Sequence, residues 1–204
     1  MIFEDVPLRQ LHEKVVAAFG ELSPIVPPPS DQFFGKLAGS IVSQQLSTKV
    51  ADVIEARVLA AIGGAWLPEL VLATDSTRLR SAGLSNAKVS YIQNSARAFS
   101  DGTVQVDQLA ILEDEHVIEQ LTKIKGVGRW TAEMFLIFTL GRPDIYSVGD
   151  YGLKKAVCQL YGLEMTIKPA QLVTISAQWQ PQRSLASRIL WKSLELPKDV
   201  PSVV

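Results

Sequence analysis

The chain has 204 residues, of which 47% are hydrophobic and 20% are charged, and its formal net charge at pH 7 is −1. This length suits one well-buried core or two small lobes, and the near-neutral charge argues against a protein that coats nucleic acid through its overall charge. The single cysteine, Cys158, excludes an internal disulfide framework and a four-cysteine metal site.

Targeting and metal-binding signals are not apparent in the chain. Residues 1–5 are acidic and lack the basic start and apolar run of a signal peptide. No segment reaches the roughly 18 uninterrupted apolar residues of a membrane span. The two histidines, His12 and His116, show no metal-ligand spacing, so we expect both at the surface and no metal site.

Apolar residues recur at the helical spacing of three and four almost throughout, and no alternating strand pattern of useful length occurs. Proline, glycine and short polar capping residues mark where the segments begin and end. We expect helices at residues 8–19, 33–42, 48–62, 68–73, 76–82, 87–99, 114–121, 129–140, 150–160, 169–177 and 181–194. The pattern therefore predicts an all-α fold of stacked helices with short loops.

The most informative stretch is a glycine-containing turn between two of these helices, Lys125-Gly126-Val127-Gly128-Arg129-Trp130-Thr131. Two glycines one residue apart make a tight turn whose backbone N–H groups can face a phosphate. The cations Lys125 and Arg129 and the hydroxyl of Thr131 strengthen that interpretation. The alternative is a helix corner that only needs two small residues.

Asp150 follows Trp130 by twenty residues and opens the next predicted helix. Its position is typical of an N-cap, where Asp is favoured. A capping carboxylate is oriented and ionised, so it can also serve chemistry next to the turn.

Several aromatic residues are spaced along helices near these features. Trp130 and Met134 are four apart on one helical face, and Trp179 and Trp191 are twelve apart near the C-terminus. Core packing is the alternative for each of them and suits Trp179 well. Aromatic faces beside a carboxylate can instead hold a flat, electron-poor ligand.

A polar segment, Ser43-Gln44-Gln45-Leu46-Ser47, lies between two predicted helices. Such residues often serve only as caps and bridging hydrogen-bond partners. A glutamine at such a tip can also push into a base stack that a nucleotide has left.

Together these residues resemble the helix-hairpin-helix DNA glycosylases, and among them the 3-methyladenine DNA glycosylase II (AlkA) type. The resemblance covers about residues 31–194 and is most specific at 121–154; the segment 41–47 and the Trp179–Trp191 pair are similar to two further signatures. It implies a two-lobed helical bundle with a cleft between the lobes. A single glycosylase unit would span residues 1–204, with one lobe at about 31–120 and a hairpin-bearing lobe formed by about 121–204 and 1–30.

The resemblance also assigns roles position by position. Asp150 falls on the catalytic carboxylate. The base-pocket wall falls on Trp130, Met134, Tyr151 and Trp191. The DNA-binding positions fall on Gly126, Val127, Gly128, Thr131, Gln44, Gln45 and Leu46. The family's hairpin can also hold a monovalent cation, and no other cofactor is implied.

One substitution indicates the subclass. Relatives that also cut the DNA backbone carry a lysine nucleophile in the hairpin, and Trp130 occupies that position here. The neighbouring cations, Lys125 and Arg129, are not at the matching position. The resemblance therefore implies a monofunctional enzyme without lyase activity.

Three departures from the AlkA type bear on DNA and base recognition. The AlkA type carries an additional β-rich N-terminal domain, and only about thirty residues precede the matching part here. Its apolar DNA wedge falls on Gln45, so either Gln45 or the neighbouring Leu46 would intercalate. Smaller or more flexible residues, Met134 and Gly152, replace an aromatic and a bulky apolar residue, which predicts a roomier pocket.

The resemblance thus implies a DNA-3-methyladenine glycosylase that hydrolyses the N-glycosidic bond of alkylated purines flipped out of duplex DNA. We expect a monomer that acts on double-stranded DNA, without a membrane partner, in the cytoplasm or at the nucleoid of a bacterium. Two alternatives remain open: a glycosylase of the same fold for a deaminated or oxidised base, and a non-catalytic DNA-binding module.

Overall fold

The computed structural model describes residues 3–197, and its regular elements are all helical. Eleven α-helices and two 3-10 helices, but no β-strand, occur in this range, which confirms the all-α prediction. None of the helices within residues 3–197 is long and apolar enough to cross a membrane.

The chain divides into two compact units. Unit 1 consists of Met1–Ile25 and Gly141–Val204, and unit 2 consists of Val26–Leu140. The resemblance had implied a hairpin-bearing lobe formed by about residues 121–204 and 1–30. In the structure residues 121–140 belong to unit 2, because the helix that they form packs against other helices of that unit.

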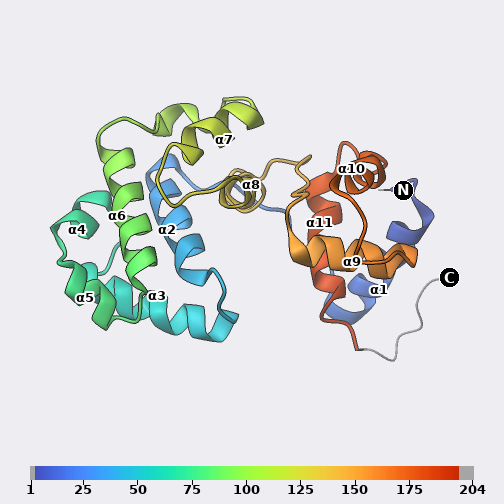
Figure 1. Cartoon of the computed structure of the whole chain (residues 1–204), viewed down its shortest axis with the longest axis horizontal. Helices are drawn as coiled ribbons and strands as arrows, with labels where there is room; N and C mark the ends of the chain where they lie inside the picture. Colours follow the sequence, from blue (N-terminus) through green and yellow to red (C-terminus); the bar gives the residue numbers. More distant parts are fainter. Residues whose placement is uncertain (1–2, 198–204) are drawn as a thin grey trace. The chain divides into compact units, whose positions relative to one another are not determined.

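Unit 2 is built around α2 (Phe33–Ser43) and α6 (Asn86–Ser100), which lie side by side (Figure 1). Leu37 of α2 is fully buried, and the Phe33 ring meets Phe135 edge-on with the ring centroids 5.7 Å apart. Each such buried apolar side chain contributes about 1.5–3 kcal/mol to folding. The remaining elements of unit 2 are η1 (Ser30–Gln32), α3 (Thr48–Ile62), α4 (Pro68–Ala73), α5 (Ser76–Ser81), η2 (Val106–Gln108), α7 (Asp114–Thr122) and α8 (Arg129–Phe138).

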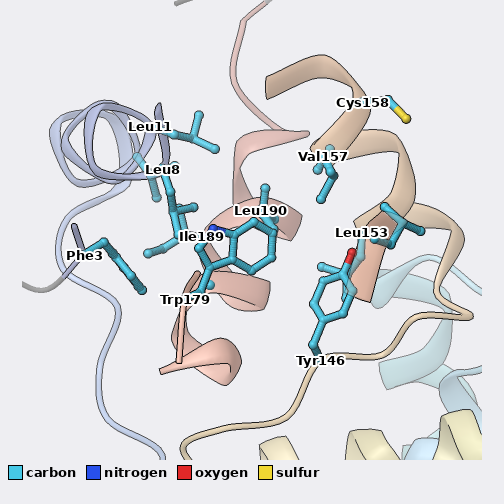
Figure 2. Close-up of a cluster of buried hydrophobic side chains, with 14 of the residues drawn as sticks. Phe3, Leu8, Leu11, Tyr146, Leu153, Val157, Cys158, Trp179, Ile189 and Leu190 are labelled. Carbon is cyan, nitrogen blue, oxygen red and sulfur yellow. The ribbon is translucent and has the colours of Figure 1, made fainter. Parts of the chain in front are cut away.

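Unit 1 joins the N-terminal helix to the C-terminal helices around an apolar core. Its elements are α1 (Val6–Phe19), α9 (Tyr151–Tyr161), α10 (Pro169–Ala177) and α11 (Arg183–Ser193). Figure 2 shows this core, in which Leu8 of α1, Leu153 of α9 and Leu190 of α11 are buried in one cluster with Trp179. Trp179 is only 1% exposed, which confirms core packing for this tryptophan.

Capping residues set the helix ends much as the sequence pattern predicts. Most predicted helices agree with the structure to within two residues at each end, and both 3-10 helices were missed because three-residue turns carry no periodicity. Gly63 ends α3 with a left-handed backbone, φ 102°, as a C-terminal glycine should. Asp5 caps α1 by accepting a hydrogen bond from Leu8 N at 2.8 Å, and it also accepts one from the Tyr161 hydroxyl at 2.9 Å.

The surface assignment of the two histidines is half right. His116 is exposed, as expected. The His12 side chain is only 13% exposed: its ring meets Phe3 edge-on at 6.4 Å, and Nε2 lies 3.9 Å from a carboxylate oxygen of Glu21. The prediction for His12 was wrong because the N-terminal segment folds back over it.

Candidate functional site

In unit 1, Asp150 is held by two hydrogen bonds to the same carboxylate oxygen. Oδ1 accepts from the backbone N–H of Leu153 at 2.7 Å and from the indole Nε1–H of Trp191 at 3.0 Å. The first bond is the predicted N-cap of α9, and the second fixes the carboxylate against α11. Asp150 is 9% exposed, so its orientation is set by the protein and not by solvent. A fixed carboxylate of this kind can stabilise a positive charge that develops beside it.

Gly152 makes room for this arrangement. A Cβ at Gly152 would lie 3.1 Å from Asp150 Oδ1 and 3.2 Å from Trp191 Cδ1. The space that a larger residue would fill is therefore occupied by the Asp150–Trp191 pair. The roomier pocket that the resemblance implies at Gly152 stays a prediction; the structure shows that Gly152 permits a close approach of the Asp150 and Trp191 side chains.

The two aromatic residues assigned to unit 1 differ in their exposure. Tyr151, at the first position of α9, is 73% exposed, so its ring is accessible to a ligand. Trp191 is half-buried on α11 and uses its indole N–H for Asp150. Trp191 therefore orients the carboxylate whether or not its ring face also meets a base.

The sequence pattern missed Tyr146, a buried tyrosine whose ring meets Trp179 edge-on with centroids 5.5 Å apart. Figure 2 shows it between the loop that precedes α9 and the core. Burial, and then the nearby negative charge of Asp150, raise the pKa of the Tyr146 hydroxyl well above its usual range. Its hydroxyl has no hydrogen-bond partner among the described residues. An isolated aromatic residue in a loop carries no sequence signal for such a place.

In unit 2, the two glycines of the hairpin between α7 and α8 have different functions. Gly126 has φ 104°, and a Cβ there would lie 2.0 Å from the ring of Tyr91, so both the backbone and the close packing require glycine. Gly128 is the N-cap of α8, with extended backbone and no side-chain hydrogen bond, and a Cβ there would meet nothing within 4 Å. The start of α8 is thus kept clear, as a phosphate-binding helix N-terminus requires.

Val127 lies between these glycines but faces inward. Its side chain is 4% exposed and its backbone N–H donates to the carbonyl oxygen of Ile124 at 2.9 Å. The Lys125 carbonyl oxygen accepts from Asn94 Nδ2 at 3.0 Å. These two hydrogen bonds hold the turn in place, and no chemical step is assigned to the monovalent cation that the family's hairpin can hold.

Arg129 forms ion pairs with two glutamates of this chain. Its guanidinium donates to both carboxylate oxygens of Glu115 at 3.0 and 2.6 Å, and its Nε donates to Glu133 Oε1 at 2.9 Å. Hydrogen bonds from Arg129 lower the pKa of Glu115, and the carboxylates in turn raise the pKa of the guanidinium. The sequence pattern had counted Arg129 toward a phosphate clamp, whereas the structure uses it to join α7 to α8.

Thr131 and Gln44 were assigned to DNA binding separately, and the structure brings them together. Gln44 Nε2 donates to Thr131 Oγ1 at 3.2 Å, and Thr131 is only 4% exposed. These residues therefore connect the segment after α2 to the first turn of α8. Their contact is a bridge within unit 2, which agrees with the bridging alternative for the glutamine.

Gln45 is the exposed residue at the end of this segment. It has φ 60°, a left-handed backbone that is uncommon outside glycine and often marks functional sites. The turn is closed by the N–H of Leu46, which donates to the Ser43 carbonyl at 3.1 Å, and Leu46 is half-buried. Of the two candidates for a DNA wedge, Gln45 is the one that the turn presents to solvent.

The two residues of α8 assigned to the base pocket lie four residues apart on the same face of the helix but differ in their exposure. Trp130 is 39% exposed at the second position of α8, and Met134 is 7% exposed. Trp130 is therefore accessible to a ligand, while Met134 belongs mainly to the packed interior of unit 2.

Comparisons with known proteins agree with this fold and these motifs. A family model described as HhH-GPD superfamily base excision DNA repair protein matches residues 38–182. The Bacillus subtilis protein YfjP is 34% identical over 164 residues, which are 76% of this chain and 56% of that relative. The chain thus spans little more than half the length of that protein.

Two solved structures are similar over most of the chain. The DNA-3-methyladenine glycosidase of Bacillus halodurans has a TM-score of 0.77 and 36% identity, covering 94% of this chain and 86% of its own. The 3-methyladenine DNA glycosylase of Schizosaccharomyces pombe, in complex with abasic DNA, has a TM-score of 0.79 and 28% identity, covering 94% and 98%. Since the family model matches more than half of the chain, this protein belongs to the HhH-GPD superfamily of base excision DNA repair proteins.

Proposed function

We propose that this protein is a monofunctional DNA glycosylase that releases alkylated purines, such as 3-methyladenine and 7-methylguanine, from double-stranded DNA. The observation that carries the proposal is the buried Asp150 carboxylate, fixed through one oxygen by Leu153 N and Trp191 Nε1. A DNA-binding module without chemistry needs no such oriented carboxylate. The two solved relatives, named as enzymes for 3-methyladenine, support the choice of substrate class.

The chemistry assigned to Asp150 follows from the charge of the reaction. A purine alkylated at N3 or N7 is already cationic and leaves readily, so little acid catalysis is required. As the N-glycosidic bond breaks, the sugar develops oxocarbenium character. The Asp150 carboxylate stabilises that positive charge and directs a water toward C1′, and its two hydrogen bonds keep it in place before the reaction starts.

Base recognition in this proposal depends on stacking. In unit 1, Tyr151 offers an exposed ring next to Asp150 in the sequence. Trp130 is assigned to base stacking separately, as an exposed ring of unit 2. A cationic base is attracted to the faces of such rings. Recognition by charge and stacking, with few base-specific hydrogen bonds, gives a broad range of alkylated substrates.

DNA holding is assigned to unit 2. The open N-terminus of α8 at Gly128 binds a backbone phosphate through its N–H groups, and Gln45 enters the base stack when the damaged nucleotide leaves it. Neither contact depends on net charge, in agreement with a chain whose formal charge is −1. We propose that the protein acts as a monomer in the compartment that holds the DNA.

The test is to incubate the protein with DNA that carries labelled methyl groups on its purines and to identify the released bases. Release of 3-methyladenine and 7-methylguanine supports the proposal. Binding to duplex DNA without release of any base indicates the non-catalytic module. Release of hypoxanthine or an oxidised base in preference to methylated purines indicates a glycosylase of the same fold with another substrate.

Asp150→Asn tests the carboxylate and Asp5→Asn is its matched control. Both aspartates lie in unit 1, cap a helix, and accept one backbone and one side-chain hydrogen bond at Oδ1. We expect Asp150→Asn to lose base release while it still binds DNA, and Asp5→Asn to keep base release. Retained excision by Asp150→Asn removes this residue from the catalytic role.

A further inference from the structure

One face of α6 supports both proposed DNA-contacting segments of unit 2. Lys88, Tyr91 and Asn94 are three residues apart, so they follow one another along the same side of the helix. Lys88 reaches the segment after α2, and the other two reach the hairpin. None of the three stood out in the sequence pattern as a functional residue.

Lys88 holds the segment that presents Gln45. Its Nζ donates to the carbonyl oxygens of Val42 and Gln44, both at 2.7 Å. The first of these carbonyls lies at the end of α2, where carbonyls lack helical partners. The second directly precedes Gln45, whose φ is 60°. An ammonium group that binds the two carbonyls on either side of Ser43 stabilises this turn against other backbone conformations.

Tyr91 and Asn94 hold the hairpin in a corresponding way. Asn94 Nδ2 donates to the carbonyl oxygen of Lys125 at 3.0 Å. The Tyr91 ring lies so close to Gly126 that a Cβ there would be 2.0 Å from it. Three contacts on successive turns of α6 therefore fix the Gln45 segment and the hairpin to a single rigid helix.

A separate bond joins the two segments directly. Gln44 donates through its side chain to Thr131 Oγ1 at 3.2 Å, while its carbonyl accepts from Lys88. Gln44 is thus held at both ends, and Gln45, the next residue, extends from it into solvent. These contacts form a closed loop: Lys88 binds Gln44, Gln44 binds Thr131 in the hairpin-bearing helix, and the hairpin contacts α6 again.

We propose that Lys88 is a positioning residue for base flipping, which it serves by holding Gln45 at a fixed place relative to the phosphate-binding hairpin. This inference rests on the proposed function, because it assigns Gln45 to the base stack. The phosphate contact sets the position of the DNA backbone, and Lys88 sets where Gln45 enters relative to it. Because the segment that carries Gln45 is already ordered, its conformational entropy is not lost during the reaction, which is the advantage of a preorganised site.

Lys88→Met is the variant that tests this role, with Lys36→Met as its matched control. Both remove one positive charge from unit 2 and keep an unbranched side chain, but Lys36 is exposed near the start of α2. Flipping is followed by the fluorescence of 2-aminopurine placed beside an abasic site. Base release is followed in single turnovers at saturating enzyme.

We expect Lys88→Met to lower the fluorescence increase and to slow single-turnover release by about tenfold or more, as loss of a charge-assisted hydrogen bond at a transition state would do. Its Kd for undamaged duplex should change by less than about twofold, because the hairpin that grips phosphate remains held by Asn94 and Tyr91. Lys36→Met should match the wild type in all three measurements. Wild-type flipping and release by Lys88→Met overturn the inference.

A double-mutant cycle with Gln45→Ala separates positioning from general stability. If Lys88 acts through Gln45, the double variant should have a release rate and a fluorescence increase within about twofold of those of Gln45→Ala alone. A double variant in which the two single losses multiply overturns the inference. If Lys88→Met does not fold, Lys88→Gln, which keeps one donor, enters the same cycle with the same criterion. A wild type that releases no base refutes the proposed function, while the 2-aminopurine cycle still decides on Lys88.

Discussion

Trp191 donates its indole N–H to Asp150 Oδ1 at 3.0 Å, so a residue near the C-terminus orients the carboxylate that caps α9. The same oxygen accepts from Leu153 N at 2.7 Å. The first turn of α9 orients Asp150 through Leu153 N, and α11 orients it through the indole of Trp191. This makes Trp191 a positioning residue for the proposed chemistry.

We predict that Trp191→Phe lowers base release while leaving the fold intact. The phenyl ring keeps an aromatic face but has no N–H, so the Asp150 carboxylate loses one of the two bonds that orient it. A hydrogen bond to a charged group is worth about 1.5–3 kcal/mol, which corresponds to about 10- to 100-fold in rate. The measurement is single-turnover release of methylated purines together with the melting temperature.

Trp66→Phe is the matched control for this variant. Trp66 also donates its indole N–H to a carboxylate, Glu55 Oε1 at 3.0 Å, but it lies in unit 2 and has no proposed part in the chemistry. Trp66→Phe should keep the wild-type rate. Equal rates for Trp191→Phe and Trp66→Phe would show that the bond to Asp150 does not contribute to catalysis.

A second prediction concerns Gly126→Ala, which should destabilise unit 2 and weaken DNA binding. The left-handed backbone alone costs about 1–2 kcal/mol with an L side chain, and the overlap with the Tyr91 ring adds about 1–3 kcal/mol. Together these should lower the melting temperature by about 4–20 °C for a protein of this size. Thermal unfolding and binding to undamaged duplex DNA measure the two effects.

Gly102→Ala separates the two costs. Gly102 has φ 80°, but a Cβ there would meet nothing within 4 Å. Its alanine variant should therefore show only the backbone cost and should bind DNA normally. The explanation through Tyr91 fails if the two alanine variants lose the same amount of stability.

The features that the sequence predicts well are those that depend on neighbours along the chain. Asp150 was identified as a helix cap because a short polar residue after a glycine opens an apolar pattern, and the structure confirms the cap. Gly126 and Gly128 were identified as a tight turn for the same kind of reason; Gly126 lies in that turn, and Gly128 follows it as the N-cap of α8. In each case the signal extends over only a few residues.

The interactions that the sequence does not predict join residues far apart in the chain. Trp191 bonds to a residue 41 positions away, and Gln44 bonds to one 87 positions away. Tertiary packing decides such pairs, and no local pattern encodes them. Arg129 is an intermediate case: Glu133 lies four residues later on the same helix face, a local signal for an ion pair that the sequence analysis did not use.

A third prediction concerns acid stability. Burial opposes the charged form of Asp144, but hydrogen bonds from Arg183 at 2.8 and 2.9 Å outweigh it and hold the pKa of the carboxyl below its usual value. Since the folded pKa is lowered, the pair stabilises unit 1 above the unfolded pKa of about 3.9, and that stability is lost as the pH falls through the lower folded pKa. The free energy of unfolding should therefore decrease as the pH is lowered from about 5 toward 2.

Asp144→Asn should reduce this dependence on pH, because its side chain has no proton to gain in that range. Urea unfolding of both proteins at a series of pH values provides the measurement. Glu69→Gln, which removes an exposed carboxylate at the start of α4, serves as the control and should follow the wild-type curve. A wild type and an Asp144→Asn variant with parallel curves would mean that the Arg183 pair contributes nothing to acid stability.

The last prediction concerns strand cleavage. An enzyme that also cuts DNA uses an amine to attack C1′ and forms an imine that borohydride reduces to a stable covalent complex. The resemblance assigns Trp130 to the matching position, and Trp130 supplies no amine, so the wild type should leave abasic DNA uncut and give no trapped complex. Because Trp130 is 39% exposed, Trp130→Lys can direct an amine to solvent without a large loss of packing. It should give a trapped complex, whereas Trp130→Met, of similar length, should give none.

A trapped complex with the wild type would contradict the monofunctional assignment. If Trp130→Lys also gives no trapped complex, the result argues against the position assigned to Trp130.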